Sequence, residues 1–232
     1  MNRPRSKTGV GASVKLNPTA LSVRRAIRPA NTTKTTRVTV LFADLRGYTG
    51  MAERLAPAQI VPLLDEFFGV LAAATARHGG QVFHMAGDGM MAGFGVDAVE
   101  DGARQALTAG HAMLQEFCAV AARWRRELSI ETGIGVGLHL GEVALGLLGP
   151  PGHKQTTLVG DTVNVAARLC SRARAGEVLL SCTVAAALEA AGVAPGADPR
   201  SIPFLQLPQF ELRGRSAPLD IWCVPAVERL AF

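Results

Sequence analysis

The chain has 232 residues, 48% of them hydrophobic and 19% charged, with 25 glycines, 13 prolines and a formal net charge of +5. This composition is that of a globular protein, and it excludes collagen, low-complexity disorder and disulfide scaffolds. The four cysteines show no C-x-x-C spacing, which favours buried thiols in a reducing, cytoplasmic compartment. The longest apolar stretch, residues 67–76, is shorter than the roughly 18–20 residues that a membrane-spanning helix needs.

The basic residues are concentrated at the N-terminus. Residues 1–37 carry nine Lys or Arg and no acid, whereas the remainder has 15 basic and 19 acidic residues, a charge of −4. A cationic segment with few large apolar residues predicts a disordered tail or linker over residues 1–36, and weak contact with an anionic membrane surface is one hypothesis for it. We therefore predict one folded domain over residues 37–225 and a short C-terminal end over 226–232.

The first half of this domain reads as a strand, a helix and a hairpin. Residues 38–43 form an apolar, β-branched run of strand length, and Pro57 opens a stretch to residue 78 with apolar residues at helical spacing. Residues 82–86 and 90–94 flank Gly-Asp-Gly, which is typical of a hairpin turn.

The second half repeats this alternation. The patterns predict a helix over 99–126, a second hairpin of strands 134–139 and 143–148, a helix over 163–170, and strands over 178–180, 204–212 and 219–224. The order β-α-ββ-α-β with additional strands predicts an α+β fold, a ferredoxin-like βαββαβ core with helices packed on a largely antiparallel sheet.

Two acidic residues fall at one edge of this predicted sheet. Asp44 follows the first strand, and Asp88 lies at the tip of the first hairpin, whose strands neighbour the first strand in a ferredoxin-like sheet. Two carboxylates with an adjacent backbone carbonyl, such as that of Leu45, are ligands that Mg²⁺ or Mn²⁺ prefers, and two such ions can assist phosphoryl chemistry. Taken singly, each aspartate is more commonly a helix cap or a turn residue.

Four motifs occur in order and at matching separations. They are LFADLRGYT at 41–49, GDGMMAGFG at 87–95, GLHLGEV at 137–143 and VGDTVNVAARL at 159–169. On these motifs the sequence resembles the class III adenylyl/guanylyl cyclase catalytic domain, in its Thr-type, bacterial-like subgroup, over about residues 37–224. The resemblance implies conversion of a nucleoside triphosphate to its 3′,5′-cyclic monophosphate and pyrophosphate.

The resemblance also implies a role for each matching residue. Asp44 and Asp88, with the Leu45 carbonyl, match the ligands of two Mg²⁺ or Mn²⁺ ions per site. Asn164 matches the asparagine that orients the ribose, and Arg168 matches the arginine that stabilises charge on the α-phosphate. The two residues are four apart in a predicted helix, which places both on one face.

Further implied contacts involve the triphosphate and a second chain. Arg215 matches a lysine that contacts the triphosphate, with Arg213 as the neighbouring candidate; arginine can bind phosphate bidentately. The family's site is shared between two subunits, and one chain carrying both sets of residues implies a head-to-tail homodimer. Residues 149–154 resemble the family's dimerisation arm, although a plain surface loop is the simpler interpretation of that segment alone.

Base selection rests on two residues. Thr157 occupies a position where adenylyl cyclases carry Asp or Thr, and its hydroxyl can accept from adenine N6. His84 replaces the matching lysine, and imidazole can donate to adenine N1 or to guanine O6. These residues favour ATP as the substrate, with GTP as the alternative.

Two other classes of function stay open. Gly135 stands where some family members have a phosphate-binding arginine, for which Arg46 or Arg215 is a candidate substitute. With His84, this departure keeps open a nucleotide-binding regulatory module without turnover. A nucleic-acid-binding ferredoxin-like domain ranks last, because aromatic residues make up only 5% of the chain and the charge outside the tail is negative.

Overall fold

The computed structural model describes residues 33–97, 101–193, 204–210 and 218–225. The predicted C-terminal end lies outside these ranges. The predicted tail does too, apart from its last four residues, and Lys34 already belongs to the first strand.

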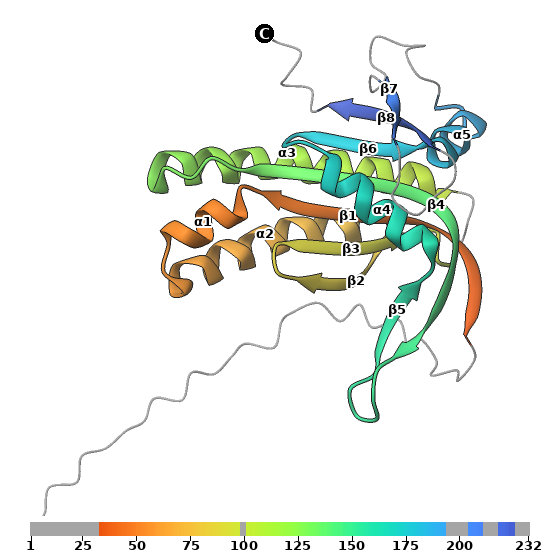
Figure 1. Cartoon of the computed structure of the whole chain (residues 1–232), viewed down its shortest axis with the longest axis horizontal. Helices are drawn as coiled ribbons and strands as arrows, with labels where there is room; N and C mark the ends of the chain where they lie inside the picture. Colours follow the sequence, from red (N-terminus) through yellow and green to blue (C-terminus); the bar gives the residue numbers. More distant parts are fainter. Residues whose placement is uncertain (1–32, 98–100, 194–203, 211–217, 226–232) are drawn as a thin grey trace, which may run out of the picture. The chain divides into compact units, whose positions relative to one another are not determined.

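Eight strands and five helices alternate along the described residues (Figure 1). They are β1 Lys34–Arg46, α1 Tyr48–Arg54, α2 Pro57–Arg77, β2 Gln81–Ala86, β3 Gly89–Phe94, α3 Gly102–Leu128, β4 Gly133–Leu148, β5 Gln155–Val159, α4 Asp161–Arg172, β6 Glu177–Ser181, α5 Cys182–Ala190, β7 Leu205–Phe210 and β8 Leu219–Pro225.

The strands form one sheet in the order β2-β3-β1-β4-β6-β8-β7, and β5 pairs with β4 outside this path. Only the β4–β6 pair is parallel among the described strands. The first four strands, with α2 and α3 as crossovers, have the order β2-β3-β1-β4 of a ferredoxin-like βαββαβ unit. The predicted α+β fold class is thereby confirmed, and β5, β6, β7 and β8 are its additional strands.

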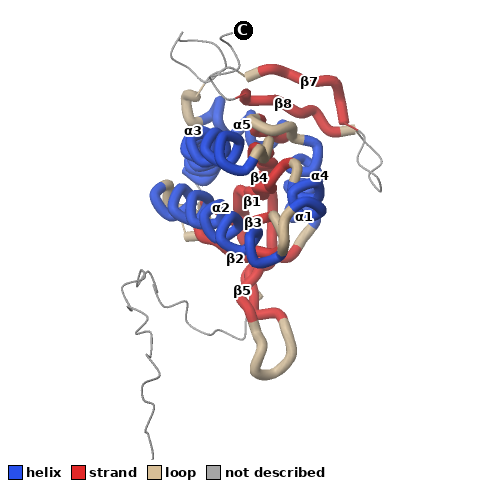
Figure 2. Tube along the Cα trace, turned by 90° about the vertical axis from the view of Figure 1, so that its left-hand side faces the viewer, coloured by secondary structure: helices blue, strands red, loops and turns tan. Residues whose placement is uncertain are grey.

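The two faces of β4 carry different side chains because successive residues of a strand point to opposite sides. Ile134, Val136 and Leu138 are buried in the large core formed with α2 and α3. On the other face Gly133 and Gly137 have no side chain. There α4 lies against the sheet, on the side opposite α2 and α3 (Figure 2).

Close packing explains these glycines. A Cβ on Gly137 would stand 2.1 Å from the Cys170 backbone nitrogen and 2.5 Å from the Ala166 carbonyl oxygen, so no larger residue fits under α4. Apolar residues of α4, among them Val165 and Leu169, are buried against the sheet.

The predicted second hairpin is wrong. Residues 133–148 form one continuous strand, in which Gly141 pairs with Val38 of β1 instead of turning. A Cβ on Gly141 would lie 2.5 Å from Thr162 Oγ1, and that hydroxyl donates to the Glu142 carbonyl oxygen at 2.6 Å. The glycine therefore makes room for the first turn of α4, and the chain reverses later, between β4 and β5.

Helices α2 and α3 pack on each other over aromatic side chains. Phe67 and Trp124 each meet Phe117 edge-on, with ring centroids 5.6 and 5.3 Å apart. The Trp124 indole N–H donates to Glu66 Oε2 at 3.0 Å.

Among the described helices, α2 alone has the length and apolar composition of a membrane span, a weak criterion that core helices also meet. Here its inner face belongs to the core.

The remaining differences concern short elements and helix ends. Helices α1 and α5 were not predicted, and α3 begins at Gly102, so the first residues of its predicted range lie outside the described chain.

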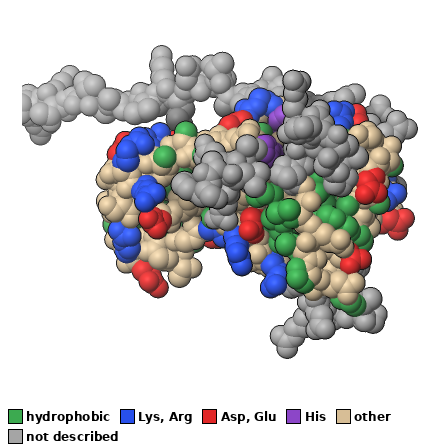
Figure 3. Space-filling view, turned by 90° about the horizontal axis from the view of Figure 1, so that it is seen from above, with side chains coloured by type: hydrophobic (Ala, Val, Ile, Leu, Met, Phe, Trp, Pro, Cys, Tyr) green, Lys and Arg blue, Asp and Glu red, His purple; other side chains and the backbone are tan. Residues whose placement is uncertain are grey.

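The surface seen from above in Figure 3 mixes basic with acidic side chains in its described part, and hydrophobic side chains gather in one area of it.

Candidate active site

Asp44 and Asp88 lie side by side at one end of the sheet. Asp44 is paired with Gly89 at the first position of β3, directly after Asp88 in the turn. The Leu45 N–H donates to the Asp88 carbonyl oxygen at 2.9 Å, and a Cβ on Gly89 would be only 3.3 Å from Asp44 Oδ1. The sequence prediction that these two acids meet at one edge of the sheet agrees with this register.

The two acids also interact electrostatically. The pKa of Asp44 is raised above its ordinary value, first by burial of the carboxyl group and then by the negative charge of Asp88. Arg46 opposes both effects through its charge and its hydrogen bond. Holding a second negative charge beside a half-buried carboxylate is unfavourable without a cation, which is the electrostatic situation of a divalent metal site.

The donor set fits a hard divalent cation. In an extended strand the N–H and C=O of one residue point to the same side, so the Leu45 carbonyl faces the turn that holds Asp88. Two carboxylates and one carbonyl are the oxygen ligands that Mg²⁺ and Mn²⁺ take. The described part of the chain has no cluster of three or more His, Cys, Asp or Glu side chains suited to a metal. The protein thus offers a partial oxygen shell, of the kind that phosphate and water complete.

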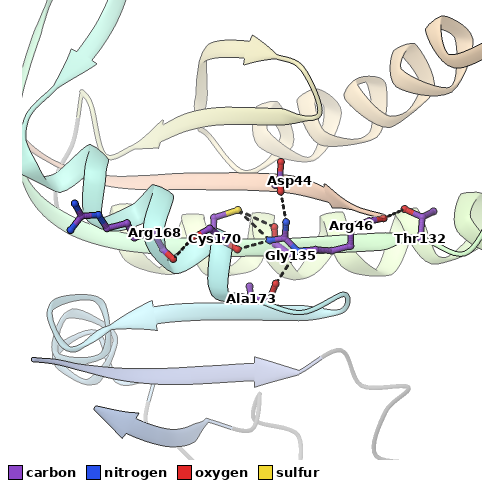
Figure 4. Close-up of polar contacts among 8 residues, drawn as sticks. Asp44, Arg46, Thr132, Gly135, Arg168, Cys170 and Ala173 are labelled. Atoms are coloured by element: carbon purple, nitrogen blue, oxygen red, sulfur yellow. Dashed lines mark hydrogen bonds and ion pairs between the residues drawn. The ribbon is translucent and has the colours of Figure 1, made fainter. Parts of the chain in front are cut away.

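Arg46 lies next to this carboxylate pair and is held from three directions (Figure 4). Its guanidinium donates to Asp44 Oδ2, to the Cys170 carbonyl oxygen and, from Nε, to the Ala173 carbonyl oxygen at 2.9 Å. Burial raises the pKa of the Cys170 thiol to about 12, so the thiol stays protonated and donates to the Gly135 carbonyl oxygen at 3.3 Å.

Asn164 and Arg168 lie on the exposed side of α4. Both side chains face solvent, whereas Val165 and Leu169 between and beside them are buried, so the helix presents them as one outward stripe. In Figure 4 the Arg168 guanidinium points away from Asp44. Within one chain, therefore, the structure does not bring Arg168 to the two acids.

The predicted base-binding residues come from neighbouring strands. His84 is exposed on β2, and Thr157 is half-buried on β5. Their chain neighbours Phe83 and Leu158 pack over Gly93, within 2.9 and 3.0 Å of a Cβ built there. The structure thus brings together the two strands that carry His84 and Thr157.

The predicted triphosphate contacts Arg213 and Arg215 lie outside the described residues. The predicted arm, residues 149–154, is the loop between β4 and β5, and these two strands carry the exposed apolar side chains of Leu147, Leu148 and Val159.

One part of this arrangement was not predicted. The sequence reasoning named Arg46 only as a substitute for a missing arginine at 135, and it did not foresee that Arg46 joins Asp44 to α4. The available signal was the alternation of glycines at 133, 135 and 137, which marks a strand face approached closely by backbone or by a large side chain.

Comparison with known proteins places this chain in a family. Residues 30–222 match the adenylate and guanylate cyclase catalytic domain. The chain belongs to this family and is a nucleotide cyclase catalytic domain.

Curated relatives share this assignment. An adenylate cyclase of Anabaena cylindrica is 32% identical over 143 residues, 58% of this chain and 27% of the relative. Adenylate cyclase 1 of Rhizobium meliloti (strain 1021) is 29% identical over 203 residues, 83% of this chain and 28% of the relative. The chain thus matches little more than a quarter of the length of each of these relatives.

Solved structures of both nucleotide specificities are similar. The adenylyl cyclase CyaB from P. aeruginosa superposes with a TM-score of 0.75 at 26% identity, covering 83% of this chain and 95% of that one. The guanylyl cyclase Cya2 superposes with a TM-score of 0.72 at 29% identity, covering 84% and 94%. The predicted resemblance is confirmed, and the neighbours include both an adenylyl and a guanylyl cyclase, so they do not select between ATP and GTP.

Proposed function

We propose that this chain converts ATP to 3′,5′-cyclic AMP and pyrophosphate, by in-line attack of the ribose 3′-hydroxyl on the α-phosphate. The observation that carries the proposal is the pair Asp44 and Asp88 beside the Leu45 carbonyl, in a domain of the cyclase family. These three groups would hold two Mg²⁺ or Mn²⁺ ions. Bound there, the ions would lower the pKa of the attacking hydroxyl and neutralise charge on the phosphates.

The remaining groups position the substrate and stabilise charge. Asn164 would orient the ribose so that its 3′-hydroxyl stands in line with the α-phosphorus, and Arg168 would stabilise the charge that builds on the α-phosphate oxygens. Arg215, with Arg213 beside it, would contact the triphosphate. No side-chain base is required in this scheme. The His139 ring is buried, with Nδ1 2.7 Å from Ser181 Oγ, in keeping with a structural role.

Two copies of the chain would share each site. Asn164 and Arg168 face outward, and Arg168 points away from Asp44 of its own chain, so the geometry favours their use in the site of a partner. A head-to-tail homodimer gives two equivalent sites, each with the aspartates of one subunit and the α4 residues of the other. The exposed apolar side chains on β4 and β5, the two strands joined by residues 149–154, are suited to that interface.

The residues at the predicted base-binding positions favour adenine. The Thr157 hydroxyl can accept from adenine N6, and no acid stands at position 84 to accept from the N1 and N2 donors of guanine. GTP is the second candidate because the exposed His84 imidazole can donate to guanine O6 as well as to adenine N1. The adenylate cyclases among the relatives support the first choice, and the similarity to a guanylyl cyclase keeps the second.

A product assay tests the proposal. Purified chain is incubated with Mn²⁺ and equal concentrations of ATP and GTP, and the cyclic products are identified by mass spectrometry. We expect cyclic AMP to predominate and an Asp44→Asn variant to yield neither product. Predominant cyclic GMP would support the alternative substrate. Nucleotide binding without any cyclic product would support the regulatory module instead.

A further inference from the structure

Arg46 connects the strand of the carboxylate pair to the helix of the outward stripe. Its guanidinium donates to the Asp44 carboxylate on one side, and to the Cys170 and Ala173 carbonyl oxygens at the end of α4 on the other. Backbone carbonyls at a helix C-terminus carry partial negative charge, so a cation is favourable there even though the Cys170 carbonyl oxygen also accepts from the Ala173 N–H at 3.1 Å. The Arg46 side chain thus provides both a positive partner for the Asp44 carboxylate and hydrogen-bond donors for the carbonyls at the end of α4.

Gly135 provides the space for this contact. A Cβ on Gly135 would stand 2.3 Å from Arg46 Nη2, 2.6 Å from Nε and 2.7 Å from Cζ. The guanidinium therefore lies directly over the backbone of residue 135, where even a methyl group would displace it. Arg46 and Gly135 form a matched pair across β1 and β4.

The contacts of Arg46 also indicate what it does not do. All three nitrogens of the guanidinium already have protein partners, because Nη1 donates to Asp44, Nη2 to the Cys170 carbonyl oxygen and Nε to the Ala173 carbonyl oxygen. A side chain whose donors are all engaged by the protein is suited to orienting its protein partners rather than to binding the triphosphate of the substrate. Lysine would not replace it, since a single ammonium cannot match three separate acceptors with the geometry of the planar fork.

We propose that Arg46 is a positioning residue that fixes the Asp44 carboxylate and the end of α4 relative to each other, with Gly135 providing its space. This inference rests on the shared site proposed above. In the head-to-tail dimer, Asp44 serves one site and α4 of the same chain serves the other. A single Arg46 therefore supports one half of each of the two sites.

Mixed dimers separate the two effects. Chains with two different affinity tags are co-expressed, and the heterodimer is purified over both tags. When Arg46→Ala is paired with Asp44→Ala, the one competent site uses Asp44 of the Arg46→Ala chain. When Arg46→Ala is paired with Arg168→Ala, the one competent site uses α4 of the Arg46→Ala chain.

The reference is the Asp44→Ala and Arg168→Ala heterodimer, in which both chains keep Arg46 and the one competent site has Asp44 from one chain and Arg168 from the other. Relative to it, we expect both Arg46→Ala heterodimers to lose on the order of tenfold or more in kcat, the scale of a misplaced catalytic group. The pairing with Asp44→Ala should also need more Mn²⁺ for half-maximal rate, whereas the pairing with Arg168→Ala should not. Full activity in the latter pairing would show that Arg46 does not serve α4 and would overturn the proposal.

An inactive reference heterodimer would instead refute the shared site, and the present inference with it. The two failures are therefore distinguishable. Arg126→Ala, which removes an exposed arginine from α3, is the matched control and should match the reference when it takes the place of Arg46→Ala in either pairing.

A double-mutant cycle tests the pair without relying on turnover. Mn²⁺ affinity is measured by electron paramagnetic resonance in the presence of 3′-deoxy-ATP, which lacks the attacking hydroxyl. Gly135→Ala should weaken Mn²⁺ binding several-fold in the native chain and have little effect in the Arg46→Ala chain, where the guanidinium is gone. Arg46→Lys should not restore native affinity. Additive effects of Gly135→Ala and Arg46→Ala would overturn the proposal, and Gly146→Ala, in an open position of the same strand, is the control.

Discussion

Leu45 and Asp88 are joined through their backbones, because the Leu45 N–H donates to the Asp88 carbonyl oxygen at 2.9 Å. This bond fixes the β2–β3 turn to the end of β1, so the carboxylates of Asp44 and Asp88 are brought together by the ladder itself. Replacing either carboxylate leaves that bond in place, and the side chains can be tested without disturbing the strand register.

We expect Asp44→Asn and Asp88→Asn each to lower kcat by at least about a hundredfold, because an amide is a poor ligand for a divalent cation. Circular dichroism and dimer content should stay native. Asp65→Asn, at an exposed position of α2, is the control and should retain activity. Near-native turnover in either site variant would remove the aspartate from the proposed metal set.

The metal-free protein should be stabilised by Asp44→Asn at neutral pH. Burial and the charge of Asp88 raise the pKa of Asp44 above its ordinary 3.8, so ionised Asp44 destabilises the folded state. This cost is absent below the ordinary pKa and grows as pH rises through the folded-state pKa. Melting temperatures in EDTA should be higher for the variant at pH 7 and converge in acid.

Added Mn²⁺ should reverse that order. The ion binds the folded native chain and raises its melting temperature, whereas the variant has lost a ligand and gains less. An Asp44→Asn chain that melts below the native chain in EDTA would contradict the electrostatic picture of the site.

Gly141→Ala should destabilise the fold by about 1–3 kcal/mol, the usual cost of overpacking. The new methyl group would stand 2.5 Å from Thr162 Oγ1 and displace the first turn of α4. Urea denaturation measures the loss. In Gly146→Ala, in the same strand, the new methyl group would lie no nearer than 3.8 Å to Thr33, so this variant should change stability by no more than about 0.5 kcal/mol. Equal costs at the two positions would refute the steric explanation.

The contact between α2 and α3 should lose strength in acid. Hydrogen bonds from Arg123 and Trp124 lower the pKa of Glu66 below its ordinary 4.5, with that from Arg123 the larger cause. The stability this adds is complete above pH 4.5 and is lost as pH falls through the lowered pKa. Thermal melts should show Glu66→Gln less stable than the native chain at pH 7, with the difference shrinking below pH 4.5. Glu53→Gln, an exposed change on α1, should show no such trend.

Much of this site follows from local sequence signals. An apolar, β-branched run marks β1, and Gly-Asp-Gly marks the β2–β3 turn, so the meeting of Asp44 and Asp88 could be predicted from strand order alone. Asn164 and Arg168 share a face because helical periodicity places residues four apart together.

The sequence-based predictions are wrong or incomplete where a residue is determined by a contact with another residue far along the chain. Gly141 resembles a turn residue locally, yet it is a glycine because Thr162, 21 positions further along, lies over it. The partners of Arg46 at Cys170 and Ala173 are 124 and 127 residues away. No local pattern encodes such contacts, and the short helices α1 and α5 are equally hard to predict because few turns give little periodicity.

The outward stripe on α4 has a consequence for control. In the proposed homodimer, a single chain carries both the metal-binding aspartates and the α4 residues Asn164 and Arg168, but these two sets point in different directions. A monomer therefore has no complete catalytic centre. Activity per chain should then rise with protein concentration and fall on dilution. A neighbouring segment that aligns or separates two copies would regulate the output without touching the nucleotide.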